Sequence, residues 1–329
     1  MPELSTCRLR LPIDEARALM RQAMARLGYA GEDGEVVVAH LIDAALCGYE
    51  YSGLPKILDA AANPQLQMPR QPMRVVHETP VSVLLDAGNQ IGMLALQRAT
   101  ELAMTRVNAT GLTIVGLTNS WMTGRSAYFM EQVARAGLVG ILTVATAGLV
   151  APSGGIKPVL GTNPLAFGWP ALPDPLVVDL GTSAISWADL ALRAQRDEPL
   201  PEGLAIDANG LPTRDPHEAR EGAILPFGGT KGFALSLAVQ ALGLLASARS
   251  IEHSRAGGVF MLVMRPDLLV PLEDLQAELA RLVSRIKASA PTGEDVRLPG
   301  ERAFSERAQR LQQGWLEIDR TVYDRLKAL

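Results

Sequence analysis

The segment with the clearest capacity for chemistry is the glycine-rich turn Pro226-Phe227-Gly228-Gly229-Thr230-Lys231-Gly232, which directly precedes an apolar helical stretch at 233–248. Glycines let the backbone approach a ligand closely, free N–H groups at a helix start attract anions, and Lys231 adds a positive charge. The turn can therefore hold a phosphate-bearing cofactor, although a tight turn with a solvent-facing lysine fits the residues equally well. It is not a Walker A loop, because the order Gly-Lys-Ser/Thr is absent.

Two further turns contain residues that suit ligand contact. Pro152-Ser153-Gly154-Gly155 is glycine-rich, and Gly161-Thr162-Asn163-Pro164 offers the hydroxyl of Thr162 within a predicted turn. Each of them alone is simply a loop. No Gly-x-Gly-x-x-Gly sequence follows a predicted strand, so a Rossmann dinucleotide site is not supported. Any nicotinamide cofactor must then be bound in another way.

The four histidines are dispersed along the chain, at His40, His77, His217 and His253. None has metal-ligand spacing with a partner, so we predict no metal site. Each is interpreted as a surface histidine or as a helix histidine whose hydrogen bonds are satisfied.

Short β-rich runs that alternate with helical patterns must position these turns. The runs lie at 81–85, 112–117, 138–144, 176–180 and 259–264, and helical patterns fill about 91–107 and 126–136. Helical spacing also dominates the first 50 residues, with a stop at Gly28 and a second helix at about 35–46. Such alternation predicts helices packed on a sheet.

The rest of the chain adds turns and amphipathic helices. Within the polar region 188–221, Asp207 to Gly210 predicts a tight turn, and Asp215-Pro216-His217-Glu218 predicts a helix start that Asp215 caps and to which Glu218 reaches back. The stretch 233–248 has 16 residues, which predicts a buried helix rather than a membrane span. Apolar residues at helical spacing over 275–286 predict another helix, followed by a polar helical tail.

Composition and charge narrow the classes of function. The 329 residues carry a formal charge of −4 without a basic block, which argues against nucleic-acid binding. The length predicts roughly two or three subdomains. No apolar run follows a basic head at the start, so no signal peptide is predicted. Cys7 and Cys47 make no disulfide framework and are expected to be reduced thiols of a cytoplasmic protein that does not bind membranes.

Taken in order, these motifs resemble those of the type-2 malate/L-lactate dehydrogenase family. The resemblance covers the chain from about residue 45 to the C-terminus and is closest to the branch of Δ1-piperideine-2-carboxylate/Δ1-pyrroline-2-carboxylate reductases. It rests on Asn119-Ser120 with Gly124 and Tyr128, Gly161-Thr162-Asn163-Pro164, Asp179 with Thr182-Ser183-Ala184, Asp207 to Gly210, Pro212-Thr213 with Asp215-Pro216, Leu225 to Gly232, and Leu298-Pro299-Gly300-Glu301-Arg302.

The resemblance implies a non-Rossmann fold of the α/β class. In that fold, helices flank a central, mostly antiparallel sheet, and both termini contribute to a helical domain. The implied divisions are a helical domain of 1–72 plus 290–329, an NAD(P)-binding sheet domain of 73–187 plus 222–289, and a small turn-rich and helical insertion at 188–221. The resemblance also implies a homodimer whose active site lies near the domain and subunit junctions, and a small-molecule substrate.

A nicotinamide cofactor is implied as well, with NADPH favoured in the imine-reducing branch and NADH as the alternative. The family's cofactor contacts fall on a loop that wraps the cofactor, a segment that follows it, a phosphate-binding turn and a closing segment. Carried over to this sequence, they are Trp121, Met122, Thr123, Gly124 and Arg125; Asp179, Leu180 and Gly181; Thr230 and Lys231; and Gly300, Glu301 and Arg302.

The sequence departs from the family pattern at the proton donor. The family's Ser-His-Gly is Tyr51-Ser52-Gly53 here, so Ser52 stands at the position of the histidine and Tyr51 at that of the serine. Met122 replaces a histidine of the cofactor loop. In the imine-reducing branch a further histidine precedes a charge-relay aspartate; Trp187 stands in place of that histidine, and Asp189 retains the aspartate. All four histidines of this chain lie elsewhere.

The positions that contact substrate in the family also change. Lys56 stands where the family has an arginine, while Thr162 keeps its family position. Lysine is a point charge without the bidentate fork of arginine, which points to a changed substrate or one that depends less on its carboxylate. Trp121 and Trp187 would make the pocket more apolar, or they simply pack in the core.

The lost histidines favour an imine substrate. Hydride transfer to a ketone creates an alkoxide that needs a proton at once, whereas an iminium nitrogen already carries its proton. We therefore predict an NAD(P)H-dependent reductase of a cyclic or biosynthetic imine, with Tyr51, Ser52 and Asp189 at the reacting end. One alternative is a 2-oxo acid reductase with Tyr51 as donor, its pKa lowered by a cation such as Lys56. The other is a cofactor-binding family member with lost or repurposed chemistry, in which Tyr51 merely packs in the cleft.

Overall fold

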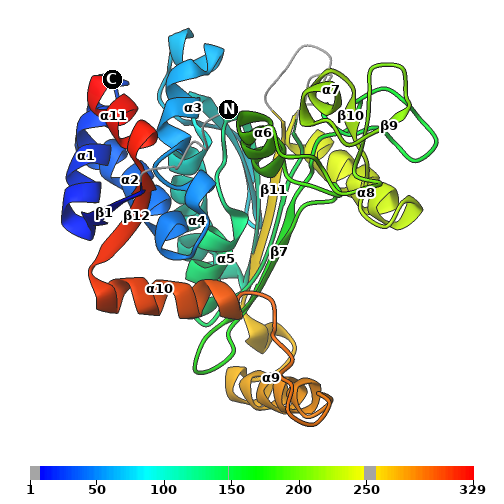
Figure 1. The fold of residues 1–329 in the computed structure, drawn as a ribbon. Coiled ribbons are helices and arrows are strands. Elements are labelled where there is room, and N and C mark those ends of the chain that lie inside the picture. The colour runs from blue at the N-terminus through cyan, green and yellow to red at the C-terminus, as the bar shows by residue number, and fades with distance from the viewer. Residues whose placement is uncertain (1–7, 147, 248–256) are drawn as a thin grey trace.

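A seven-stranded sheet forms the centre of the computed structural model, which describes residues 8–146, 148–247 and 257–329 (Figure 1). The parallel pairing of β3 with β4 is the exception in this sheet, and the other neighbouring strands pair antiparallel. The strand order is β2 (Arg74–Thr79), β3 (Ser82–Ile91), β4 (Leu112–Trp121), β11 (Val259–Met264), β5 (Val139–Val144), β6 (Leu165–Trp169) and β7 (Leu176–Leu180). The predicted α/β class with a mostly antiparallel central sheet is confirmed.

Helices cover both faces of the sheet, because successive side chains of a strand point to opposite sides. On β4, Val115 and Leu117 are buried in the core shared with α4 (Gly92–Thr110). Gly116 faces the other way, where an added Cβ would lie 3.4 Å from Ala246 of α8 (Thr230–Ala246). α5 (Ser126–Arg135) lies beside α4 and packs on β5, β6 and β7.

The two ends of the chain meet in a helical region beside the sheet (Figure 1). Strand β1 (Arg8–Pro12) pairs antiparallel with β12 (Trp315–Asp319), and their core contains residues from both ends, such as Met20, Leu41 and Ile318. The helices of this region are α1 (Ile13–Arg26), α2 (Gly31–Leu46), α3 (Lys56–Ala62), α10 (Glu301–Gln313) and α11 (Arg320–Ala328). The helical region from both termini that the resemblance implied is therefore present.

The chain between β7 and α8 forms a smaller lobe with its own core, which includes Leu190, Leu200 and Ile224. Its elements are α6 (Trp187–Arg196), β8 (Ala205–Ile206), β9 (Pro212–Thr213), α7 (Pro216–Glu221) and β10 (Ala223–Ile224). At the other end of the sheet, α9 (Leu272–Lys287) projects from the molecule (Figure 1). The short 3-10 turns are η1 (Glu50–Ser52), η2 (Pro64–Gln67) and η4 (Pro266–Leu268).

Most of the strands and helices expected from the sequence are present. The five predicted runs correspond to β3, β4, β5, β7 and β11, and the stop at Gly28 follows α1 directly. Strands β1, β2, β6 and β12 were not predicted, and β12 interrupts the expected helical tail. Cys47 is buried and unpaired, whereas Cys7, His253 and the segment used to exclude a signal peptide lie outside the described residues.

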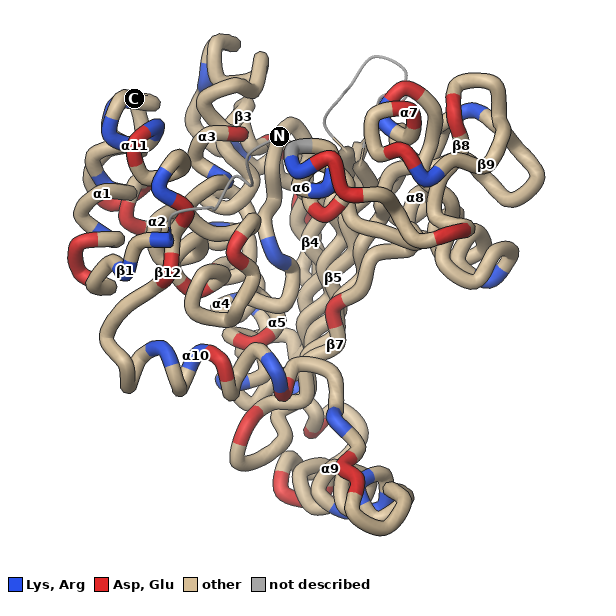
Figure 2. The backbone as a smooth tube through the Cα atoms, viewed as in Figure 1, with Lys and Arg blue, Asp and Glu red and all other residues tan. Residues whose placement is uncertain are grey.

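The prediction that the apolar helix is buried was wrong for one side of α8. Leu235, Leu237, Leu244 and Leu245 are exposed, with Leu245 at 69%. The helix packs on β4, β5 and β11 through one side, and the described chain leaves its other side uncovered. Figure 2 shows how little charge α8 carries, and Lys231 is its one charged residue. Among the described residues, no helix is long and apolar enough to cross a membrane.

One detail of the predicted helix start at Asp215 also differs. The Asp215 carboxylate accepts the N–H of His217 at 2.7 Å and caps α7 as expected. Glu218, however, accepts a hydrogen bond from the Thr213 hydroxyl at 2.5 Å, and the Asp215 N–H donates to that hydroxyl rather than to Glu218. Thr213 of β9 therefore stands between the two residues of the expected capping box.

Candidate active site

The turn η1, which carries Tyr51 and Ser52, is held tightly against the end of α2. Gly48 has a φ of +83°, which reverses the chain after the helix, and an added Cβ on Gly53 would lie 2.8 Å from the Ala45 side chain. Tyr51 and Ser52 are both half-buried. Helix α6, which begins with Trp187 and carries Asp189, packs against η1. The two segments predicted to hold the reacting groups thus lie side by side.

The predicted cofactor loop begins where β4 ends, and it passes directly over α2. Met122 and Gly124 have φ values of +57° and +75°, so the chain makes a sharp left-handed bend there. An added Cβ on Gly124 would lie 2.2 Å from Nε2 of His40. The Trp121 indole is 6% exposed and donates to the Asn89 carbonyl at 3.1 Å, which fits the core-packing interpretation of this tryptophan.

His40 lies beneath this loop and not away from the candidate site, which corrects the expectation from the sequence. The Arg125 N–H donates to His40 Nε2 at 2.9 Å, and the imidazole packs against the rings of Tyr128 and Phe129. Burial, aided by the charge of Arg125, lowers the pKa of His40 to about 3. His40 is therefore neutral at physiological pH and cannot act as an imidazolium acid there. Its spacing from Asp43 and Cys47 on one face of α2 was the sequence signal that could have placed it.

Four charged side chains form a partly buried network below the same loop. Asp43 pairs with Arg125, and Arg307 of α10 donates to Asp43 at 2.8 Å and to Glu131 at 3.0 Å. Burial would raise the pKa of Asp43, but the two guanidinium groups outweigh it and lower that pKa. Arg135 extends the network by pairing with Glu131 at 2.8 Å and with Asp174 at 3.2 Å. The three positive and three negative charges cancel, so Arg125 brings no net charge to the predicted cofactor contact.

The segment 179–182 connects the cofactor loop to the smaller lobe. Asp179 accepts the N–H of Ala127 at 2.7 Å, while the Thr182 N–H donates to the Thr162 carbonyl at 2.9 Å and the Phe227 N–H to the Thr182 carbonyl at 3.1 Å. Three motifs that are distant in sequence are thereby joined. Thr162 is half-buried at this junction, Leu180 is half-buried and Gly181 is exposed.

The surroundings of Asp179 suit contact with a ligand. The residue keeps solvent-accessible surface. The protein atoms around it nevertheless desolvate the carboxylate and raise its pKa, against the opposing effects of the Ala127 hydrogen bond and the Arg125 charge. Asp179 is exposed and accepts one backbone hydrogen bond, so its carboxylate remains available for contact with a ligand.

The glycine-rich turn before α8 is open to solvent. Gly228 and Gly229 have φ values of +56° and +62°, and no atom lies within 4 Å of an added Cβ on either residue. Thr230 and Lys231 are exposed in the first turn of the helix. A cavity of about 520 Å³ separates this turn from the second glycine-rich segment at 152–155. The backbone of the turn is therefore accessible to a phosphate group.

The remaining predicted substrate residues are largely engaged with their neighbours. Lys56 forms an ion pair with Asp59 at 3.0 Å, and this ion pair offsets the positive charge by which Lys56 was expected to act on Tyr51. Ser186 caps α6 by accepting the Asp189 N–H at 3.0 Å, and Asp189 itself is exposed. The Trp187 ring packs on the small core and faces the guanidinium of Arg220 at 5.7 Å.

The closing segment 300–302 contacts two different parts of the site. Gly300, with a φ of +86°, leads into α10, and an added Cβ would lie 3.1 Å from the Val177 carbonyl of β7. Glu301 forms an ion pair with Lys287 at 2.8 Å, and the contact with Lys287 lowers the pKa of Glu301. The Arg302 guanidinium instead lies 4.9 Å from the centre of the Tyr49 ring, next to η1.

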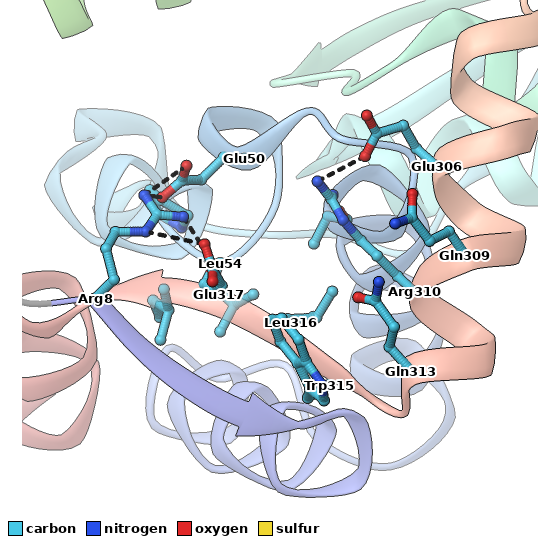
Figure 3. A pocket seen from close by; sticks show the side chains of 13 residues that line it. Arg8, Glu50, Leu54, Glu306, Gln309, Arg310, Gln313, Trp315, Leu316 and Glu317 are labelled. Carbon is cyan, nitrogen blue, oxygen red and sulfur yellow. Dashed lines mark hydrogen bonds and ion pairs between the residues drawn. The ribbon is translucent and has the colours of Figure 1, made fainter.

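A separate cavity of about 360 Å³ lies between η1, α10 and the terminal strands (Figure 3). Arg8 donates to both carboxylate oxygens of Glu50 at 2.8 and 2.9 Å, and Arg310 pairs with Glu306 at 2.8 Å. None of the predicted site residues lines this cavity. Its charged groups are paired with each other, so we do not include it in the candidate active site.

The two other histidines that the structure describes, His77 and His217, are not buried near the candidate site. His77 is exposed on β2, and His217 lies 3.0 Å from Asp197 in the smaller lobe. Within residues 8–146, 148–247 and 257–329, His40 is therefore the histidine that contacts the predicted cofactor loop, and it is neutral.

Comparison with known proteins identifies the family. The family model of malate/L-lactate dehydrogenase matches residues 11–327. Malate/(S)-sulfolactate dehydrogenase of Methanothermus fervidus is 30% identical over 328 residues, 96% of each chain. Δ1-Pyrroline-2-carboxylate reductase 1 of Burkholderia ambifaria is 34% identical over 260 residues, 75% of each chain. The structure of a dehydrogenase from Sinorhizobium meliloti superposes with a TM-score of 0.89 at 28% identity, covering 98% of both chains. The chain belongs to the malate/L-lactate dehydrogenase family, whose dehydrogenases and reductases are oxidoreductases.

Proposed function

We propose that the protein is an NAD(P)H-dependent reductase of a cyclic or biosynthetic imine. The observation that carries this proposal is the absence of a histidine acid among the described residues of the site. Ser52, Met122 and Trp187 stand at the three histidine positions of the family, and His40 is neutral. A relative that is 34% identical is named a Δ1-pyrroline-2-carboxylate reductase, which supports an imine as substrate.

The residues present fit a dinucleotide cofactor. The backbone at Gly228 and Gly229 is open, Lys231 is exposed beside it, and the exposed Asp179 is hydrogen-bonded to Ala127, just after the cofactor loop. A bound NAD(P)H supplies the hydride. NADPH is our preferred cofactor and NADH the alternative. In the proposal, Thr230 and Lys231 hold phosphate, and the 122–125 backbone and the segment 179–181 position the cofactor.

The chemistry required of the protein is modest for an iminium substrate. A cofactor held by these residues would supply two electrons and a hydrogen to the iminium carbon as hydride, and the C=N electrons would remain on the nitrogen. The nitrogen already carries its proton, so the product is a neutral amine. The site must orient the substrate and exclude water but need not donate a proton. In this assignment, Tyr51, Ser52, Thr162, Trp187 and Asp189 surround the substrate.

Two alternatives to the imine reductase are considered, and the first depends on particular residues. A 2-oxo acid reductase would need Tyr51 as proton donor; the half-buried position of Tyr51 on η1 favours this role, whereas the Lys56–Asp59 ion pair speaks against help from Lys56. A family member with lost or repurposed chemistry would bind the cofactor without turnover. The malate and sulfolactate dehydrogenases among the relatives keep the first alternative in consideration.

The deciding experiment follows NADPH and NADH oxidation by the purified protein. The substrates are Δ1-piperideine-2-carboxylate and Δ1-pyrroline-2-carboxylate, with pyruvate and oxaloacetate as controls. We expect turnover of an imine, and Tyr51→Phe should keep this rate within about threefold, because no proton is required from the phenol. Tyr323→Phe on α11 is the matched control for loss of a phenol hydroxyl. Turnover of keto acids alone, lost by about 100-fold or more in Tyr51→Phe, would establish the first alternative.

Cofactor binding is measured separately by fluorescence titration. Binding without turnover of any of the four substrates would establish the second alternative, a family member with lost or repurposed chemistry, and the reductase proposal would be withdrawn.

A homodimer is part of our proposal, and the exposed leucines of α8 support it as the surface on which a second copy packs. The cytoplasmic location and the division into domains stay predictions from the sequence.

A further inference from the structure

The cavity of about 360 Å³ outside the candidate active site has one polar wall that comes from α10 (Figure 3). Glu306, Gln309, Arg310 and Gln313 recur at the three- and four-residue spacing that places side chains on one face of a helix. Arg310 donates to Glu306 at 2.8 Å and to the Ala45 carbonyl. The two glutamine amides form no hydrogen bond with any residue that the structure describes, so both remain open to a ligand.

The opposite end of the cavity carries Arg8 of β1, Glu50 of η1 and Glu317 of β12 (Figure 3). Arg8 donates to both oxygens of the Glu50 carboxylate, at 2.8 and 2.9 Å. Glu317 lies 3.8 Å from Arg8 and 4.0 Å from Arg10, and its carboxylate accepts no hydrogen bond within the described part of the chain. Glu317 is therefore the carboxylate at this end that a hydrogen-bond donor can still approach.

Buried apolar side chains form the floor of the cavity. Leu54, Leu316 and Ile318 line it and are at most 3% exposed. Such a floor suits a hydrocarbon chain, because contact with it removes the apolar surface of a ligand from water. The volume of about 360 Å³ lies at the low end of the roughly 300 to 1,000 Å³ of ligand pockets, so a small molecule fits rather than a peptide.

The charges and hydrogen bonds of the cavity decide which class of molecule it suits. The charged residues that line it are two arginines and three glutamates, a net charge of −1. Each arginine already donates to a carboxylate and to a backbone carbonyl, so an anion would have to displace one of these partners. The groups that remain unengaged, the Glu317 carboxylate and the two amides, can all accept hydrogen bonds. A positively charged donor is therefore the group that complements this cavity.

We propose that this cavity binds an aliphatic primary amine, with its ammonium group at Glu317 and its hydrocarbon chain on the apolar floor. A second amino group at the far end of the chain, as in an aliphatic diamine, reaches the amides of Gln309 and Gln313. The assignment goes beyond the proposed reductase function and does not rest on it. Because Glu50 belongs to η1, the bound amine lies against the turn that carries two of the proposed substrate residues.

Calorimetric titration of the full-length protein tests the class of ligand. The probes are 1,5-diaminopentane, 1,5-pentanediol and glutarate, which share a five-carbon chain and differ in charge. We expect the diamine to bind at least about tenfold more tightly than the diol or glutarate, and its affinity should fall as salt is added. Equal binding of the three probes, or tighter binding of glutarate, would overturn the proposal.

Variants at the two ends of the cavity test the position of the amine. Glu317→Gln removes the charge at the proposed ammonium site and should weaken diamine binding by about tenfold. Glu273→Gln, an exposed glutamate on α9, is the matched control and should bind like the wild type. Gln313→Glu adds a carboxylate at the far end and should tighten diamine binding by about threefold or more. Gln312→Glu adds the same charge on the adjacent residue, which does not line the cavity, and should leave the affinity unchanged.

Hydrogen exchange locates the bound diamine without any need for turnover. The amides of 50–54 and 306–318 should exchange more slowly with the diamine, whereas those of the glycine-rich turn 226–232 should not change. The proposal is overturned if the wild type binds no diamine at millimolar concentration, if Glu317→Gln binds it like the wild type, or if Gln312→Glu gains as much affinity as Gln313→Glu. Protection of the glycine-rich turn instead would also overturn it. Failure of the reductase assays leaves each of these results unaffected.

Discussion

Pairing between neighbours sets the charge and the protonation of individual residues in this site. Lys56 and Arg125 are both cations by residue type, but Asp59 and Asp43 compensate them. His40 is a potential acid by residue type, but burial keeps it neutral. The residue types therefore showed which groups are present, and the contacts decided which of them can still bind or donate.

His40 should make the stability of the protein sensitive to acid. Its pKa in the folded state is about 3, below the ordinary value of 6.5, so the unfolded chain takes up a proton first as the pH falls. The contribution of neutral His40 to the unfolding free energy is fully present above pH 6.5, and it is lost as the pH falls from 6.5 toward 3. At pH 5 this loss amounts to about 2 kcal/mol.

Urea unfolding at pH 7.5 and pH 5 measures this effect. In His40→Gln the amide oxygen can still accept the Arg125 N–H. The unfolding free energy of this variant should fall between pH 7.5 and pH 5 by about 2 kcal/mol less than that of the wild type. His77→Gln, at an exposed position of β2, is the control and should behave like the wild type. An equal pH dependence in wild type and His40→Gln would show that His40 is protonated in the folded protein.

At the scale of elements, the close approach of the cofactor loop to α2 positions the candidate site. The loop bends through left-handed φ values at Met122 and Gly124, and the Arg125 N–H closes it onto His40. A helix from the N-terminal part of the chain thus supports a loop that follows a strand of the central sheet. Tyr49 and η1 are attached to the end of the same helix, so both sides of the site share one support.

Gly124→Ala should therefore be far more harmful than the same change in an open loop. The new methyl group would lie 2.2 Å from His40 Nε2 and 2.8 Å from Met93, in addition to the strain of a positive φ. We expect a loss of about 3 kcal/mol or more in the unfolding free energy. Gly154→Ala, where φ is +83° and no atom lies within 4 Å, should cost only the backbone strain of about 1 kcal/mol.

Thermal or urea unfolding of both variants, together with cofactor titration, checks this prediction. Gly124→Ala should lose affinity for the cofactor along with stability. If the two alanine variants were equally stable, the loop would not be held against His40 in solution.

At the scale of the whole molecule, the uncovered side of α8 stands out. The helix carries exposed leucines on an almost uncharged surface, on the face of the sheet opposite α4 (Figures 1 and 2). Exposed apolar patches of this kind mark interaction surfaces in soluble proteins. The homodimer of our proposal would remove this surface from water.

Leu245→Glu should then shift the protein from dimer to monomer, because a buried carboxylate without a partner is costly at an interface. Light scattering coupled to size-exclusion chromatography measures the mass of the wild type and the variant. Leu269→Glu, at a position that is 84% exposed near α9, is the control and should leave the dimer intact. A wild type that elutes as a monomer at micromolar concentration would contradict the proposed dimer.

The sequence predicted the order of the motifs and the alternation of short apolar runs with helical patterns, because both depend on local spacing. These patterns gave five strands of the central sheet, most helices and the family. Strands β1 and β12 were missed, since each has only five residues and they pair with each other across the whole length of the chain. Strand β6 was missed because the glycine and turn residues around it mask its alternation.

The tertiary structure alone decided which charges are free and which surfaces are covered. The sequence could list Arg125, Lys56 and Arg302, but their partners come from helices that are distant in sequence or from a different turn of the same helix. It could describe α8 as apolar, but the number of elements packed around a helix is not a local property. Burial and charge compensation depend on the sum of all neighbours, and those neighbours are fixed only when the chain has folded.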